Sequence, residues 1–213
     1  MISILFLGVA AGVSHVLTGP DHFAVLAPFS VEARRSAWTV GLRWGVGHAA
    51  GIVAVALGVV FAADRLDLKL LDAAGDYLVG AVLVAVGLWG LYHGRRTDRA
   101  LEGALVAQHR HVHATAALSI GTLHGLVGTG ATLAVLPAVG MRSVAESITY
   151  LAGFSAGTIA SMSALAGLLG ALAPRDDLGT AYRRMYAFAS SASLALGAVW
   201  LALALAGVDV HAG

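Results

Sequence analysis

The chain has 213 residues, of which 58% are hydrophobic and only 12% are charged. Soluble domains average about 45–50% apolar and about 25% charged residues, so this composition excludes an ordinary soluble domain and predicts an integral membrane protein. The formal net charge of +1 excludes the basic surface that binding to nucleic acid requires. The sequence contains no cysteine, which excludes disulfides, thiolate metal sites and thiol nucleophiles.

Apolar stretches long enough to cross a bilayer, which takes about 20 residues, recur along the chain. Backbone groups in lipid must be hydrogen-bonded internally and the stretches lack strand-like alternation, so they predict an all-α bundle of transmembrane helices in one domain. We expect the first stretch to be a retained helix and not a secretory signal, because its first Lys or Arg is Arg34. The six predicted spans are residues 1–29, 38–63, 74–92, 114–139, 148–173 and 185–208.

The distribution of Lys and Arg predicts the orientation of these spans. The loops after the first, third and fifth spans hold nine of these residues, whereas the opposite side holds three. Because cytoplasmic loops carry the excess of positive charge, both termini are expected outside, in the inner or plasma membrane of the cell.

A weak internal repeat relates the two halves of the sequence. Shifting the chain by 109 positions lays residues 12–28 on residues 121–137, so that His15 falls on His124. Three helices per repeat reverse the direction of entry, which is the inverted-repeat plan of secondary transporters; a chance match of glycine-rich helices is the alternative. The predicted parts are repeat one over about 1–92, a cytoplasmic His-containing loop over about 93–113, and repeat two over about 114–208.

Ionisable side chains inside membrane spans are costly and therefore mark functional sites. His48 and His124 lie about ten residues into their spans and His15 about fourteen residues into the first one, so at a rise of about 1.5 Å per residue all three lie near the middle of a core about 30 Å thick. The ionisable residues that lie more than three positions inside the predicted spans are His15, Asp21, His22, Arg43, His48 and His124.

The first span contains a predicted helix break at Gly19-Pro20. In an unbroken helix His15 and His22 would stand about 10.5 Å apart along the axis, too far to share an ion whose ligands lie about 3–4 Å from each other. Proline cannot continue the backbone hydrogen bonding, so two half-helices are expected, with Asp21 and His22 in the first turn of the second. The dipole of that half-helix favours an ionised carboxylate.

Imidazole and carboxylate ligands without sulfur suit divalent nickel, cobalt, zinc or copper. The sequence predicts a metal site of His15, Asp21, His22 and His48, with His124 as an additional or gating ligand. Protons are expected to compete with the metal, because neutral imidazole is the binding form.

Other polar residues have competing interpretations. Arg43, Ser155 and Thr158 could line the ion pathway, but Arg43 could instead snorkel to the surface and the two hydroxyls could join helices. Intramembrane histidines can also serve only as hydrogen-bond partners between helices. Weak metal capture and a simple solvated loop both fit three histidines between the repeats, which are His109, His111 and His113.

Three motifs resemble the signatures of the nickel/cobalt permease family, and the Gly-Pro-Asp-His form looks like its urease-accessory membrane branch and related plastid proteins. The motifs are His15-Val-Leu-Thr-Gly-Pro-Asp21-His22, Arg43-Trp-Gly-Val-Gly-His48 and His124-Gly-Leu-Val-Gly-Thr-Gly130. The resemblance implies a secondary transporter, with Ni²⁺ or Co²⁺ as transported substrate and not as cofactor. The chain differs from the best-known permeases in having five residues between His15 and Asp21 instead of four, and six predicted spans instead of eight.

The sequence thus predicts a permease that takes up a divalent metal ion, with that ion and the bilayer as its partners. Efflux through the same site is one alternative. A membrane electron carrier with haem held by paired histidines, or an assembly subunit without a substrate, are others. No His-Glu-x-x-His motif occurs in the sequence, which argues against a hydrolytic metalloenzyme, and no enzymatic activity is expected.

Overall fold

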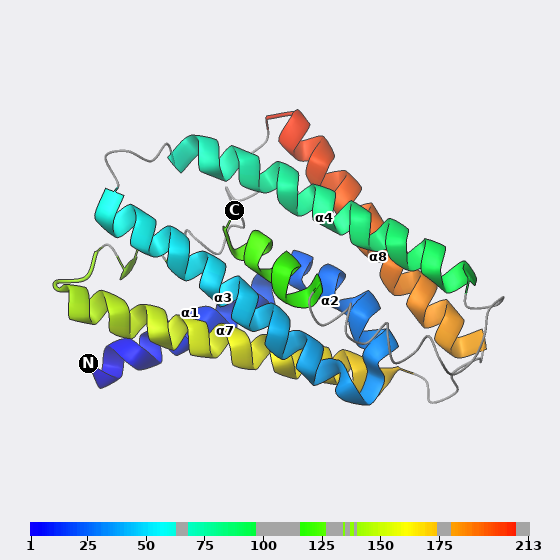
Figure 1. Ribbon diagram of the computed structural model, residues 1–213, viewed down its shortest axis with the longest axis horizontal. Helices are drawn as coiled ribbons and strands as arrows, with labels where there is room; N and C mark the ends of the chain where they lie inside the picture. Colours follow the sequence, from blue (N-terminus) through cyan, green and yellow to red (C-terminus); the bar gives the residue numbers. More distant parts are fainter. Residues whose placement is uncertain are drawn as a thin grey trace.

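The computed structural model describes residues 1–62, 68–96, 116–126, 134, 137–138, 140–173 and 180–207, and none of these residues forms a strand. The predicted all-α class is confirmed. In chain order the helices are α1 (Ile2–Thr18), α2 (Pro20–Ala33), the 3-10 helix η1 (Arg34–Ser36), α3 (Ala37–Ala62), α4 (Leu68–Arg96), a helix over Ala116–Leu126, α7 (Val144–Leu172) and α8 (Thr180–Leu205) (Figure 1).

Helix α2 occupies the centre of the bundle. It contacts α3, α4, α7 and α8, while α1 and α3 each pack along α7 and α4 packs along α8 (Figure 1). Buried apolar side chains on several helices meet around α2, among them Leu26, Trp44, Leu83 and Met162. The residues at the start of α2 are therefore enclosed by protein on several sides.

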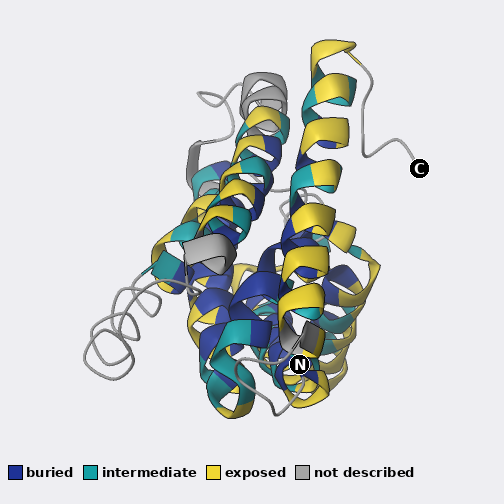
Figure 2. Cartoon of the chain, turned by 90° about the vertical axis from the view of Figure 1, so that its right-hand side faces the viewer, coloured by how far each residue is buried: buried dark blue, intermediate teal, exposed yellow. Residues whose placement is uncertain are grey.

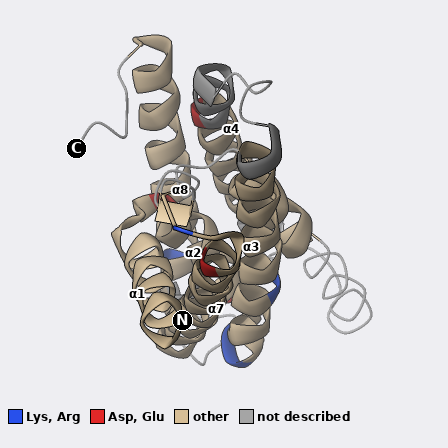
Figure 3. Cartoon of the chain, turned by 90° about the vertical axis from the view of Figure 1, so that its left-hand side faces the viewer, with Lys and Arg blue, Asp and Glu red and all other residues tan. Residues whose placement is uncertain are grey.

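The outer faces of the helices are apolar as well. Figure 2 shows buried residues on the inward faces and exposed ones on the outward faces, and Figure 3 shows few charged residues along the described helices. Large apolar side chains such as Ile2, Phe188 and Leu205 are about three-quarters exposed, at 74%, 76% and 75%. Such a surface suits contact with lipid and not with water.

Three helical stretches within the described residues are long and apolar enough to cross a membrane, and six were expected. They are Pro20–Val59, Val144–Leu172 and Arg183–Leu205. Three further apolar helices are shorter, at Ile2–Thr18, Asp76–Tyr92 and Ala116–Leu126. The first predicted span falls short as a single helix because it is divided at Gly19, and the fourth is described as a continuous helix only over residues 116–126.

Glycines allow two pairs of helices to approach backbone to backbone. A Cβ atom added at any of these glycines would overlap a backbone atom of the opposing helix, so only glycine fits. In the α1–α7 pair the glycines are Gly8, Gly12, Gly153 and Gly157. In the pair of α3 with the 116–126 helix they are Gly47, Gly51, Gly121 and Gly125.

The α1–α7 contact yields a stability prediction. Gly157→Ala is expected to lower the free energy of unfolding by about 1–3 kcal/mol, because the new methyl group must push the Val9 carbonyl away. Gly167→Ala on the same helix is the control, since its nearest neighbour, the Trp38 Cβ, lies 3.5 Å from the added atom. Unfolding of both variants in detergent measures the difference, and equal stabilities would contradict the close packing.

Candidate metal centre

The helix break brings the first two histidines together. Helix α1 ends at Thr18, Gly19 is extended (φ −83°, ψ 103°), and Pro20 opens α2. The Gly19 amide still donates to the His15 carbonyl, at 3.1 Å, so the change of direction is confined to one residue. As a result the imidazole rings of His15 and His22 lie 4.6 Å apart between centroids, instead of about 10.5 Å apart along one helix.

Five polar residues meet at this point, and we call them the histidine cluster: His15 on α1, Asp21 and His22 on α2, His48 on α3 and His124 on the 116–126 helix. None of the five is more than 5% exposed. The structure thus brings together all five residues for which the sequence predicted a role as metal ligands. Charged or strongly polar groups are rarely buried to this extent unless they have partners or bind an ion.

Two hydrogen-bonded pairs form the outer parts of the cluster. The Nε2 atoms of His15 and His48 lie 3.1 Å apart, so one ring donates and the other accepts, and the two ring planes are nearly parallel at 4°. The Nε2 atom of His124 lies 2.7 Å from Oδ2 of Asp21. Asp21 is in the first turn of α2, where the helix dipole also stabilises its negative charge.

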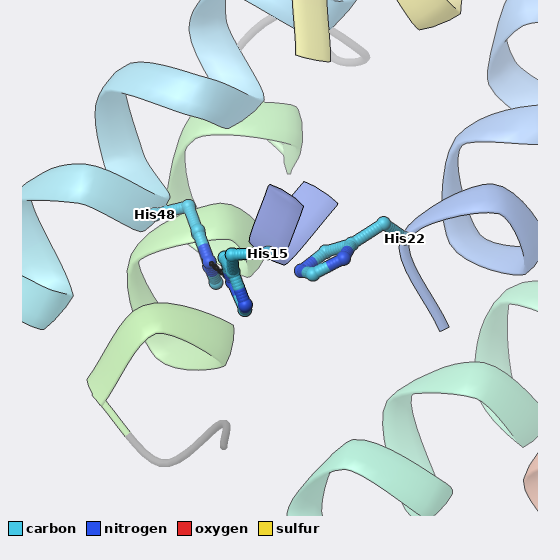
Figure 4. Close-up of side chains that lie close together, drawn as sticks. All are labelled: His15, His22 and His48. Atoms are coloured by element: carbon cyan, nitrogen blue, oxygen red, sulfur yellow. Dashed lines mark hydrogen bonds between the residues drawn. The ribbon is translucent and has the colours of Figure 1, made fainter. Parts of the chain in front are cut away.

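His22 lies between these two pairs. Its ring centroid is 4.6 Å from that of His15, 5.2 Å from that of His48 and 5.4 Å from that of His124. Its closest polar approach to Asp21 is 3.8 Å, beyond hydrogen-bonding distance. Figure 4 shows the rings of His15, His22 and His48 pointing toward one another from separate segments of the chain.

The ligand atoms of the cluster form two groups of three. In each group the imidazole nitrogens or carboxylate oxygen lie within 4.8 Å of one another: His15, His22 and His48 in one, Asp21, His22 and His124 in the other. Ligands around a bound transition metal lie about 3–4 Å apart, so a shift of about 1 Å would complete either site. The arrangement can therefore hold a divalent ion with nitrogen and oxygen ligands.

Several buried polar atoms at the cluster lack a hydrogen-bond partner within the described part of the chain. These atoms are Nδ1 and Nε2 of His22, Nδ1 of His48, Nδ1 of His124 and Nε1 of Trp44. A buried polar group left without a partner costs about 1–3 kcal/mol. Trp44 was not among the sequence-predicted site residues, although its ring lies 6.0 Å from that of His124 and its position one turn before His48 could have indicated it.

The other sequence-predicted pathway residues do not belong to either group of ligand atoms. Arg43 is exposed on α3, as snorkelling would require, and Ser155 is half-buried on α7. Thr158 is fully buried, and its hydroxyl faces Gly12 of α1, one turn from His15. His109, His111 and His113 lie outside the described residues.

Comparison with known proteins gives two relatives. The chain is similar to two plant chloroplast proteins. It is 32% identical over 177 residues to "Chloroplast protein FOR GROWTH AND FERTILITY 1" of Arabidopsis thaliana, a match covering 76% of the chain and 48% of the relative. To "Chloroplast protein FOR GROWTH AND FERTILITY 2" of the same plant it is 29% identical over 185 residues, covering 80% and 48%. The chain thus spans about half the length of the curated relatives it matches, and no protein-family model or solved structure matches it.

These comparisons correct two predictions. Assignment to the nickel/cobalt permease family was wrong, because the matching proteins are named for chloroplast growth and fertility and no permease family model matches. A match at three short motifs is a weak basis for assigning a family. The predicted plasma-membrane location was wrong as well, since both relatives are chloroplast proteins by name.

The geometry of the break yields a second prediction. A Cβ atom at Gly19 would overlap Nδ1 of His22 and lie 2.8 Å from Oδ1 of Asp21, so Gly19→Ala is expected to displace both ligands and weaken metal binding at least about tenfold. Titration of the purified protein with Co²⁺ measures the affinity. Gly167→Ala on α7, where the added methyl group has room beside the Trp38 Cβ at 3.5 Å, is expected to keep wild-type affinity. Unchanged affinity in Gly19→Ala would show that the cluster does not depend on this turn.

Proposed function

We propose that the protein transports a divalent transition-metal ion across a membrane by way of the histidine cluster. The observation that carries this proposal is the burial of four imidazoles and one carboxylate, each at most 5% exposed, between the helices of a chain with lipid-suited outer faces. The ion is the substrate and not a resident cofactor. Histidine and aspartate bind borderline ions such as nickel, cobalt, zinc and divalent copper, so the ligand set defines a class of ions.

The charge of the cluster supports this assignment. The five residues include a carboxylate and no lysine or arginine, so the cluster favours a divalent cation and does not suit an anion. The water-excluded surroundings strengthen the attraction between Asp21 and a cation. Imidazole nitrogens replace the water that the ion leaves behind when it enters the bundle.

We further propose that the bundle has six transmembrane helices arranged as two inverted three-helix repeats. The packing of glycines supports this plan, because the relationship is reciprocal between the halves. Helix α1 of the first half packs by its glycines on α7 of the second, and the 116–126 helix of the second half packs in the same manner on α3 of the first. Each half thereby contributes a histidine to the cluster, His15 from the first and His124 from the second. Transporters of this plan hold their substrate between the repeats and expose it alternately to the two sides.

The contact between His15 and His48 disfavours the haem alternative. Two axial histidines hold the macrocycle between them, whereas these two rings are hydrogen-bonded directly to each other. Uptake and efflux would use the same site, and transport measured in each direction distinguishes them. In view of the relatives' names, we propose a chloroplast membrane as the location.

Transport assays in sealed proteoliposomes test this function. Wild-type protein is expected to move Ni²⁺, Co²⁺ or Zn²⁺ along an imposed gradient, and His22→Ala is expected to abolish this movement because His22 belongs to both ligand groups. Tyr77→Phe is the matched control; its hydroxyl donates to the Ala204 carbonyl, away from the cluster, and its transport is expected to remain near that of wild type.

Two results would contradict the proposal. One is the failure of wild-type protein to bind any of these ions when purified in folded form. The other is transport by His22→Ala at the wild-type rate.

A further inference from the structure

We propose that the histidine cluster is two overlapping metal sites that share His22, and that a single ion passes between them while His22 remains bound. This inference rests on the proposed metal transport and adds the order of ligand exchange within the site. One site consists of His15, His22 and His48, and the other of Asp21, His22 and His124. We call them the three-histidine site and the aspartate site.

The hydrogen bonds of the cluster support two sites over one. His15 is paired with His48 and Asp21 with His124, so each site has two ligands that are already in contact with each other. His22 forms no hydrogen bond to either pair and lies 3.8 Å from Asp21. Its ring centroid is 4.6 Å from that of His15, 5.2 Å from that of His48 and 5.4 Å from that of His124, so the ring is within reach of both pairs. A single site for all five ligands would require their donor atoms to converge on one point, but the distances group them three and three.

The two sites differ in charge, so they are expected to bind the ion with different affinities. The three-histidine site is neutral, whereas the aspartate site contains a carboxylate that attracts a dication strongly in a buried setting. The aspartate site is therefore the tighter of the two. An ion in the three-histidine site needs to release only His15 and His48 to reach it, because His22 is common to both.

The sites also differ in where their ligands lie along the chain. The three-histidine site comes entirely from α1, α2 and α3, whereas the aspartate site needs His124 on the 116–126 helix. A change in the position of that helix would alter one site and leave the other intact. Exchange between sites is thus a means by which helix movement can control release of the ion.

Occupancy is one ion at a time. Two dications separated by one imidazole in a water-poor interior would repel each other strongly. The expected stoichiometry is therefore one ion per chain, although the cluster contains ligands for two sites.

The test is titration of the purified 213-residue chain in detergent with Co²⁺, whose visible absorption reports the ligands that it binds. Wild type is expected to bind one ion per chain. The double variant His15→Gln/His48→Gln leaves the aspartate site, so its affinity should stay within about threefold of wild type. Asp21→Asn/His124→Gln leaves the three-histidine site, so its affinity should fall at least tenfold and its Co²⁺ spectrum should differ from that of the first double variant. His22→Gln should lower affinity at least a hundredfold.

Transport separates exchange from binding. Both double variants are expected to lose transport in proteoliposomes, because each lacks one of the two metal sites. This includes the first double variant, which still binds the ion. Glutamine and asparagine preserve side-chain size, and thermal unfolding of every variant verifies that it is folded. A variant that does not fold is replaced by the corresponding single substitutions, His48→Gln or Asp21→Asn, with the same expected directions.

Each remaining outcome has a defined meaning. Equal loss of affinity in both double variants indicates a single site built from all five ligands and overturns the two-site inference while leaving metal transport in place. Two ions per chain, or full transport by either double variant, also overturns it. Absence of Co²⁺ binding to folded wild-type protein overturns the proposed function itself.

Discussion

The cost of burying polar ligands in an apolar bundle is the constraint on which the site depends. Four imidazoles and a carboxylate lie away from solvent. One hydrogen bond within each of the two pairs satisfies only some of their polar atoms. Nδ1 of His48 and Nδ1 of His124 have no partner among the described residues. Since each such group costs about 1–3 kcal/mol, a bound cation offers the compensation that the protein atoms do not.

Two backbone features make this arrangement possible. The break at Gly19-Pro20 folds the first polar motif back on itself, so that His15 and His22 meet although seven positions separate them in the sequence. Glycines then let neighbouring helices approach until their backbones touch, which brings His48 and His124 into the same space. A helix with larger side chains at these positions would hold its histidine farther from the centre.

Much of this site could be predicted from the sequence, because its causes are local. The chemistry of proline predicts the break, and the helical rise predicts that His15, His48 and His124 lie at a similar depth. The pairing of Asp21 with His124, 103 positions apart, could not be predicted, since it depends on which faces of which helices pack together. The shared position of His22 and the approach of Trp44 depend on the same packing. The family prediction was wrong for a different reason. Short motifs indicate local geometry, but they do not establish common ancestry.

The most direct test of a metal held by the histidine cluster is X-ray absorption spectroscopy of the purified protein loaded with one Ni²⁺ per chain. We expect a first shell of nitrogen and oxygen atoms at about 2.0–2.1 Å, with the outer-shell scattering of at least two imidazole rings, and the loss of that imidazole signal in His22→Gln. A first shell of water oxygen atoms alone, without imidazole scattering, would contradict it.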